Sequence, residues 1–320
     1  MFINTNSLCE YIKDQNMILP SLFFVILITL SMDYVYAEKP SITLIYPQTK
    51  SSYMKVVNAM INGMKKNERI NLVKYEANDK TTASDIFEVI NKRNSDAVIS
   101  LGSYALDIVN KASLSIPVIA GATLLRSDTK AGISLIGSPV EFIQTLKNIA
   151  PDVRHIHVVY NRHNSDWYIK KSVVVAKSQG IKLKMYQADN VSEAAVLYRE
   201  ILNKVDDNKD AIWILMDRVV PQNAILPEIL KHAWDKNIVT FSSNPIHVKQ
   251  GVLFALYPDY EKVGYDLAKL AEEIISSNEV SSIYPVTGMK TSVNTRTASH
   301  LGLRISPLQL EKFDSVFPLH

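Results

Sequence analysis

The sequence predicts an α/β protein with two Rossmann-like lobes, each built on a parallel sheet and joined to the other by a multi-strand hinge. Short apolar stretches alternate with amphipathic segments of helical periodicity, which is typical of βαβ units. The alternation pauses at Arg126–Gly137 and then starts again, so that each half holds roughly four strand–helix steps. At 320 residues the chain is also long enough for two domains of roughly 100–200 residues each.

The first half contains four short apolar stretches that we expect to be strands. Two of them, Ala97–Leu101 and Pro117–Ala120, end in glycine-containing turns, and Thr81 or Thr82 is placed to cap the helix between the second and third strands. The other two strands are Ile42–Tyr46 and Asn71–Tyr75, and the remaining helices are Ser52–Lys66 and Tyr104–Ala112.

The second half repeats this rhythm without a visible sequence repeat. Its predicted helices are Pro139–Ala150, Trp167–Gln179, Glu193–Lys204 and Gln222–Asn237. Its predicted strands are His155–Tyr160, Ile181–Gln187 and Ala211–Leu215.

The stretch Ile238–Ser276 is interpreted as the hinge around which the two halves are arranged. Two apolar runs, Ile238–Phe241 and Gly251–Tyr257, flank a polar turn, and a long amphipathic helix follows them. We therefore expect lobe 1 to comprise residues 38–126 and 248–285, and lobe 2 to comprise residues 127–247. Residues 286–320 are expected to return to the hinge or the lobes.

The N-terminal segment, residues 1–37, has the pattern of a secretory signal peptide. Residues 19–30 form an apolar run that is shorter than the ~20 residues a membrane span needs, and Val35-Tyr36-Ala37 follows with small residues at −3 and −1. We expect cleavage after Ala37 and a secreted protein; the alternative is an uncleaved anchor.

Composition excludes several classes of protein. The net charge of +3 does not predict a nucleic-acid partner, since such a surface needs clustered Lys and Arg. Cys9 is the sole cysteine, so a disulfide within the chain is impossible and a cysteine-ligated metal site is not expected. We expect a monomer without cofactor or metal.

Polar and aromatic residues just after the predicted strands are the candidate ligand contacts, because open α/β sheets bind ligands beyond the carboxyl ends of their strands. Helix starts near Ser52, Tyr104 and Asn164–Trp167 are expected to direct free N–H groups at the same crevice, which suits a carboxylate. The candidates are Gln48, Ser51, Ser103, Thr123, Tyr160, Asp217, Asn244 and Tyr257.

Each candidate has a structural alternative. Ser and Asn at helix starts also serve as caps. Asp217 either binds the amino group of a ligand or pairs with Arg218, and Tyr257 either touches the ligand or only packs in the hinge.

Motifs that would indicate catalysis are absent from the sequence. There is no G-x-S-x-G elbow, no P-loop and no G-x-G-x-x-G after a strand. His155 and His157 share one face of a strand, but no Cys or acidic cluster adjoins them in sequence. We therefore do not expect an enzyme.

Several segments between Ser41 and Phe317 resemble the ABC-transporter substrate-binding protein family, of the tryptophan/tyrosine-type periplasmic kind. They are SLGSYALDIV, VVYNRHNSD, WILMDRVVPQNAILPEIL, GVLFALYPDYEKVGYDLAKLAEEII and SVNTRTASHLGLRISP. The resemblance implies a type I periplasmic-binding-protein fold, with three crossing strands and a ligand clamped between two lobes. It also implies that the eight candidates above occupy ligand-facing positions.

Two departures from the family pattern concern the ligand. Met216-Asp217-Arg218 stands where relatives often carry Thr-Asp-Asn, and the loop PQTKSSY lacks their usual His-Pro element. The resemblance therefore does not imply which ligand is bound.

The leading hypothesis is a periplasmic solute-binding protein of an ABC-type importer. It would bind a small polar or aromatic molecule, such as an amino acid, by hinge closure and then dock on a membrane permease. One alternative is a periplasmic sensor that presents its ligand state to a membrane receptor kinase. The other is a secreted α/β enzyme.

Overall fold

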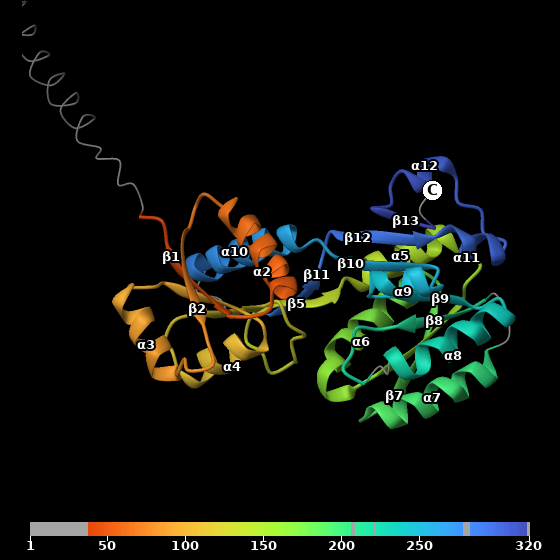
Figure 1. Cartoon of the computed structure of the whole chain (residues 1–320), viewed down its shortest axis with the longest axis horizontal. Helices are drawn as coiled ribbons and strands as arrows, with labels where there is room; N and C mark the ends of the chain where they lie inside the picture. The colour runs from red at the N-terminus through yellow and green to blue at the C-terminus, as the bar shows by residue number, and fades with distance from the viewer. Residues whose placement is uncertain (1–37, 206–208, 220–221, 278–281, 319–320) are drawn as a thin grey trace, which may run out of the picture. The chain divides into compact units, whose positions relative to one another are not determined.

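The computed structural model describes residues 38–205, 209–219, 222–277 and 282–318 (Figure 1). The predicted signal peptide and its cleavage site after Ala37 lie outside these residues. Residues Pro40–His320 form one compact unit. Within the described ranges, no helix has the length and apolar character that a membrane crossing requires.

The first of two sheets is parallel throughout and carries helices on both faces (Figure 1). Its strands, in spatial order, are β11 (Ile283–Val286), β5 (Gly132–Gly137), β4 (Val118–Gly121), β3 (Ala97–Leu101), β1 (Ser41–Pro47) and β2 (Asn71–Ala77). Its helices are α2 (Ser51–Lys65), α3 (Ala83–Lys92), α4 (Ser103–Lys111) and α10 (Tyr260–Ser277). Thr82 caps α3 in a capping box with Asp85, which confirms one of the two predicted caps.

The second sheet is parallel except where β10 and β12 pair antiparallel. Its spatial order is β13 (Ser315–Phe317), β12 (Met289–Asn294), β10 (Phe254–Pro258), β9 (Val239–Ser242), β8 (Asp210–Ile214), β6 (His155–Tyr160) and β7 (Lys182–Gln187). Its helices are α5 (Pro139–Ile149), α6 (Arg162–Ser178), α7 (Val191–Lys204), α8 (Gln222–Asp235), α9 (Pro245–Gln250), α11 (Thr295–His300) and α12 (Pro307–Leu310). The two parallel-sheet α/β lobes of the prediction are confirmed.

Strand pairing moves the lobe boundaries away from the predicted positions. β5 lies in the stretch Arg126–Gly137, where no periodicity was visible, and it pairs with β4, so lobe 1 extends beyond residue 126 to about Gly137. β10 pairs with β9 in the second sheet, so the predicted return to lobe 1 at residue 248 is wrong; the chain returns between Pro258 and Tyr260. The polar turn after β9 leads into α9 rather than across the hinge.

The C-terminal segment belongs to the second lobe. β12 and β13 extend the second sheet beyond β10, so this part of the chain completes lobe 2. β12 pairs antiparallel because it enters directly from β11 in the other sheet, without the helical crossover that a parallel connection needs.

Backbone and charge interactions link the three described crossings between the sheets, which follow β5, β10 and β11. The Glu141 carboxylate accepts from the backbone N–H groups of Gly288 and Met289, each at 2.8 Å. Lys290 Nζ lies 3.3 Å from an Asp259 carboxylate oxygen, which joins the second crossing to the third. These contacts bring the three crossing segments together.

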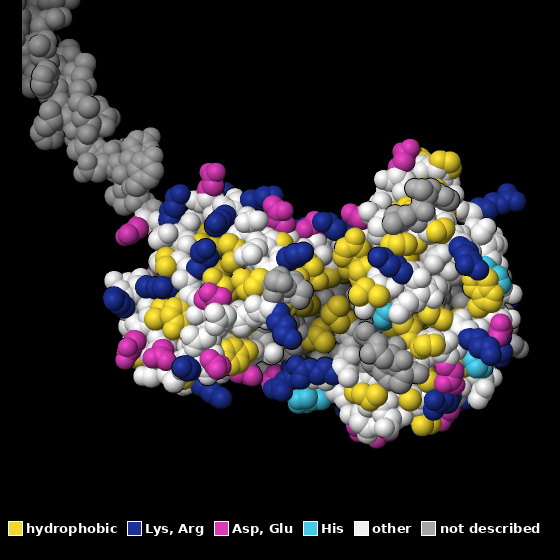
Figure 2. Space-filling model, viewed as in Figure 1, with side chains coloured by type: hydrophobic (Ala, Val, Ile, Leu, Met, Phe, Trp, Pro, Cys, Tyr) yellow, Lys and Arg dark blue, Asp and Glu magenta, His cyan; other side chains and the backbone are white. Residues whose placement is uncertain are grey.

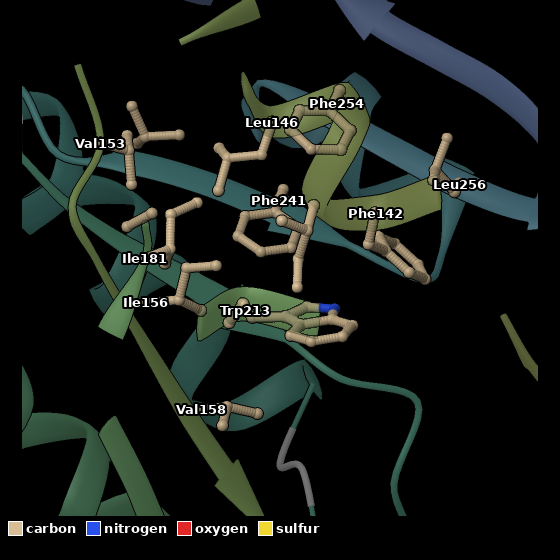
Figure 3. Close-up of a cluster of buried hydrophobic side chains, with 14 of the residues drawn as sticks. Phe142, Leu146, Val153, Ile156, Val158, Ile181, Trp213, Phe241, Phe254 and Leu256 are labelled. Carbon is tan, nitrogen blue, oxygen red and sulfur yellow. The ribbon is translucent and has the colours of Figure 1, made fainter. Parts of the chain in front are cut away.

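An aromatic stack holds the central strands of the second sheet in register. Trp213 on β8 is directly opposite Phe241 on β9, which in turn is opposite Phe254 on β10. Their ring centroids are 5.3 Å and 5.1 Å apart, and all three side chains are fully buried (Figure 3). A one-residue slip of any strand would turn its ring to the opposite face, so this stack specifies a single pairing.

Two glycines allow α2 and α10 to pack backbone against backbone in the first lobe. A Cβ at Gly264 would lie 1.9 Å from the carbonyl oxygen of Met60, and one at Gly63 would lie 1.7 Å from that of Glu261. The opposing atoms belong to the backbone of a helix, so they cannot move aside without displacing it. Glycine is therefore required where these helices meet.

We predict that Gly264→Ala lowers the free energy of unfolding by about 3 kcal/mol, because overpacking against a rigid backbone costs about 1–3 kcal/mol or more. The comparison variant is Gly180→Ala, whose φ is +70° but whose added Cβ has open space. It should cost about 1 kcal/mol from backbone strain alone. Urea denaturation of both variants checks this; an equal loss would contradict the proposed close approach.

Candidate functional site

A pocket of about 480 Å³ opens at the carboxyl ends of β8, β9 and β10. Its volume lies within the usual range for small-molecule sites, roughly 300–1,000 Å³. Ligands of open α/β sheets bind at this edge. The wall is formed by Ile214, Leu215, Met216, Ser242, Ser243, Asn244, Pro245, Tyr257, Pro258 and Tyr260.

The turn after β9 supplies the polar part of this wall. Asn244 caps α9, and its side-chain oxygen accepts from the backbone N–H of Ile246 at 3.0 Å. Pro245 occupies the first helical position, where its missing N–H costs no hydrogen bond. The Ser242 hydroxyl accepts from the backbone N–H of Asn244 at 3.1 Å, so the turn is held from within.

Ser243 is the one pocket residue with a buried side-chain polar atom that has no partner among the described residues. Its side chain is 3% exposed, and its hydroxyl makes no hydrogen bond to any residue that the structure describes. A buried hydroxyl without a partner costs roughly 1–3 kcal/mol. A polar group of a bound molecule would remove that cost, so this hydroxyl is a candidate ligand contact.

The pocket brings together two of the eight predicted contacts, Asn244 and Tyr257. Tyr160 is buried at the end of β6, and Thr123 is half-buried after β4, but neither lines this pocket. Gln48 and Ser103 are exposed beyond β1 and β3. Ser51 begins α2, and its side chain lies outside the described part of the structure.

Asp217 is buried and bonded to protein donors on three sides. One carboxylate oxygen accepts from the Asn161 N–H at 3.1 Å and from the Ser165 hydroxyl at 2.5 Å, while the other accepts from the Val219 N–H at 3.1 Å. It makes no ion pair with Arg218, and it does not line the pocket. We therefore propose that Asp217 joins the loop after β8 to the start of α6, instead of contacting the amino group of a ligand.

The three helix N-termini that we expected to carry free N–H groups differ in whether a side chain caps them. α6 begins at Arg162, earlier than predicted, and Asn161 caps it by accepting from the Asn164 N–H at 3.2 Å. α2 and α4 have no side-chain cap hydrogen bond. The first turns of α2 and α4 thus lack a side-chain cap, although the Tyr53 N–H in α2 donates to the Lys50 carbonyl oxygen at 3.1 Å, whereas the first turn of α6 is partly satisfied by Asn161.

Sequence reasoning missed several pocket residues, of which Tyr260 is the most informative. Tyr260 begins α10 and reaches the pocket from the lobe 1 side of the second crossing. Burial raises the pKa of its phenol, so it is neutral at physiological pH. The Pro258-Asp259-Tyr260 turn before a helix was a usable signal, because residues at a crossing face both lobes.

His155 and His157 belong to a cluster at the opposite end of the second sheet. Both approach one Asp210 carboxylate oxygen, at 3.2 Å and 3.1 Å, and His157 also contacts the Tyr186 hydroxyl at 3.0 Å. Burial, opposed by Asp210, lowers the pKa of His157. Among the described residues, no group of three or more His, Cys, Asp or Glu side chains has the arrangement of a metal site.

Charges on the face of the molecule seen in Figure 2 are mixed. Lys and Arg side chains are spread over it with Asp and Glu among them (Figure 2). Solvent-accessible ion pairs such as Lys66 with Glu261 and Arg199 with Glu228 contribute little to stability.

We predict that Asp217→Asn lowers the free energy of unfolding by about 2 kcal/mol without any ligand present. The substituted amide replaces one acceptor by a donor, which leaves an N–H or O–H donor unsatisfied in a buried site. Arg218→Gln is the control, because Arg218 is exposed and makes no ion pair with Asp217. Unchanged stability of the Asp217→Asn protein would contradict the structural role.

Residues 41–314 match the model of the family described as ABC transporter substrate binding protein. The tyrosine-binding protein of Clostridioides difficile (strain R20291) is 24% identical over 224 residues. That alignment spans 66% of this chain and 63% of the length of the relative.

Solved structures share the fold at low identity. An ABC domain in complex with L-Trp from Streptococcus pneumoniae has a TM-score of 0.54 and 17% identity, covering 88% of this chain and all of that one. A ligand-free, open structure of a substrate binding protein with adhesive properties from Clostridium difficile has a TM-score of 0.58 and 19% identity, covering 87% of this chain and 99% of that one.

Proposed function

This chain belongs to the ABC transporter substrate binding protein family, and on that premise we propose that it binds one small solute in the pocket at Ser242–Pro245 and Tyr257–Tyr260. The solute is an amino acid, preferably with an aromatic side chain. The loaded protein passes it to a membrane permease for import.

The observation that carries this proposal is the unpartnered hydroxyl of Ser243 in the wall of the pocket. Proteins rarely leave such a group without a partner, so each exception needs an explanation, and for a group in a pocket wall a bound ligand is one. A ligand that supplies a donor or acceptor to this hydroxyl gains a hydrogen bond while the protein loses a desolvation cost.

The rest of the wall favours a ligand with an apolar, planar body. Tyr257, Tyr260 and Pro258 provide ring surfaces, and Ile214, Leu215 and Met216 provide aliphatic or thioether surface. Aromatic groups stack on such surfaces, and a Met side chain adapts to their edges. The named relatives bind tyrosine and L-Trp, which supports the same class of ligand for this chain.

Closure about the three crossings explains how binding would be signalled to a permease. Tyr257 lies on the last strand before the second crossing, and Tyr260 begins the first helix after it. A ligand that contacts both residues favours the arrangement in which they approach each other, so it shifts the population toward a closed state. The apolar run at residues 19–30 and Ala37 support export to the periplasm.

The test is titration of the purified protein with L-tyrosine and L-tryptophan by calorimetry, with L-aspartate as a charged comparison. We predict saturable binding of at least one aromatic amino acid. Absence of binding to both would reject the proposed ligand class.

Ser243→Ala should weaken that binding about five- to tenfold, the loss expected for one neutral hydrogen bond worth about 1 kcal/mol. The unfolding free energy without ligand should stay the same or rise, since a buried unpartnered hydroxyl is removed. Ser100→Ala is the matched control. Its hydroxyl is equally buried and unpartnered, but Ser100 lies in β3 of lobe 1 and does not line the pocket. Equal affinity losses in both variants would overturn the role of Ser243.

A further inference from the structure

We propose that His247 is a positioning residue of the pocket. Its neutral ring holds Asn244 and Ser242 in their present orientation, and protonation of the ring releases Asn244. The effect on ligand affinity rests on the proposed function, whereas the effect on Asn244 does not.

The hydrogen bonds around Asn244 decide which nitrogen of His247 carries the proton. The side-chain oxygen of Asn244 is committed to the backbone N–H of Ile246, so its amide nitrogen is the atom that lies 3.4 Å from His247 Nε2. An amide nitrogen only donates. His247 Nε2 must therefore accept, and the proton of the neutral ring is on Nδ1.

The second ring nitrogen fits the same assignment. His247 Nδ1 lies 2.7 Å from the Ser242 hydroxyl oxygen and donates to it. That oxygen also accepts from the backbone N–H of Asn244, and its own proton is donated to the Ile214 carbonyl at 3.3 Å. One donor and two acceptor positions are all that a hydroxyl offers, so the network is complete with this tautomer alone.

The surroundings of His247 oppose protonation. The side chain is 3% exposed, and burial lowers its pKa below the usual value of 6.5. α9 packs against β9, β10 and β12. The charged or titratable side chains on these four elements are Lys249, Tyr257 and Lys290, none of which is negative at neutral pH. No anion on them offsets the charge of an imidazolium.

Protonation would place a second donor, Nε2–H, against the amide nitrogen of Asn244. To avoid this clash, the amide has to turn over, which withdraws its oxygen from the N–H of Ile246 and removes the cap of α9. Asn244 and Ser242 both line the pocket, so the change reaches the binding surface. A ligand fitted to the present orientation favours the neutral ring and lowers the pKa of His247 further in the complex.

The direction of the pH effect on the Kd follows from the lower pKa of His247 in the complex than in the ligand-free protein. Well above the pKa of the ligand-free ring, which burial holds below 6.5, the ring is neutral with and without ligand, so the Kd is constant. As the pH falls through the pKa of the ligand-free protein, only that state takes up a proton, and the Kd rises by up to about tenfold per pH unit. The rise ends at the lower pKa of the complex.

The first test needs no ligand. NMR of the 15N-labelled protein at pH 7.5 should show Nδ1–H and an unprotonated Nε2 for His247. On acidification, the side-chain amide signals of Asn244 should shift with the same midpoint as the His247 ring. A His247 ring with its proton on Nε2, or Asn244 side-chain amide signals that do not shift as the ring titrates, would overturn the proposal.

The second test measures the Kd for L-tyrosine and L-tryptophan between pH 8 and pH 5, where neither the amino nor the carboxyl group of these ligands titrates. The wild type should bind more weakly at the acid end, by up to about tenfold per pH unit below the pKa of the ligand-free ring, and His247→Gln should bind weakly at every pH. His157→Gln is the control, because His157 is also buried with a lowered pKa but contacts Asp210 and Tyr186, away from the pocket. It should keep the pH dependence of the wild type. A pH-independent wild-type Kd, or unchanged pH dependence in His247→Gln, would refute the positioning role.

If neither amino acid binds at any pH, the proposed ligand class fails. The ligand-free NMR result then decides alone whether His247 positions Asn244.

Discussion

The aromatic stack of Trp213, Phe241 and Phe254 is the interaction on which the site depends. It crosses three adjacent strands at matched register positions, and each ring is fully buried. The pocket begins one to three residues further along each strand, at Ile214, Ser242 and Tyr257. Correct register of the stack thus places the pocket wall, and a slip of one residue would turn these side chains into the wrong layer.

Polar groups near the pocket differ in how fully the protein satisfies them. Asp217 has three internal donors, and Ser242 uses its complete hydrogen-bonding capacity. The hydroxyl of Ser243, the residue that follows Ser242, has no hydrogen-bond partner among the described residues. This contrast separates groups that build the site from a group left available to a ligand. Replacing the first kind should cost stability, whereas replacing the second should cost affinity.

The crossings between the lobes combine fixed and adjustable parts. Glu141 binds two successive backbone N–H groups after β11, so the first and third crossings are joined by charge-assisted hydrogen bonds. The second crossing has a half-exposed ion pair between Asp259 and Lys290, which is weaker in water. Motion between the lobes would be absorbed within these segments, and the pocket lies against the second of them.

Periodicity in the sequence alone determined most of the elements and the two-lobe α/β class. Buried strands such as Ala97–Leu101 and the apolar stripe of Tyr260–Ser277 follow from local pattern, because side-chain spacing reports which face of an element is buried. Local pattern also selected Asn244 and Tyr257, which lie at strand ends and line the pocket.

Tertiary structure alone decided which strands share a sheet and which polar groups remain free. Pairing partners are distant in sequence, so nothing local showed that β5 belongs to lobe 1 or that β10 and β12 belong to lobe 2. Asp217 and Ser243 look alike as polar residues after buried strands. Only the folded chain brings three donors to the first and, within the described ranges, none to the hydroxyl of the second, because such donors come from segments that the fold places nearby.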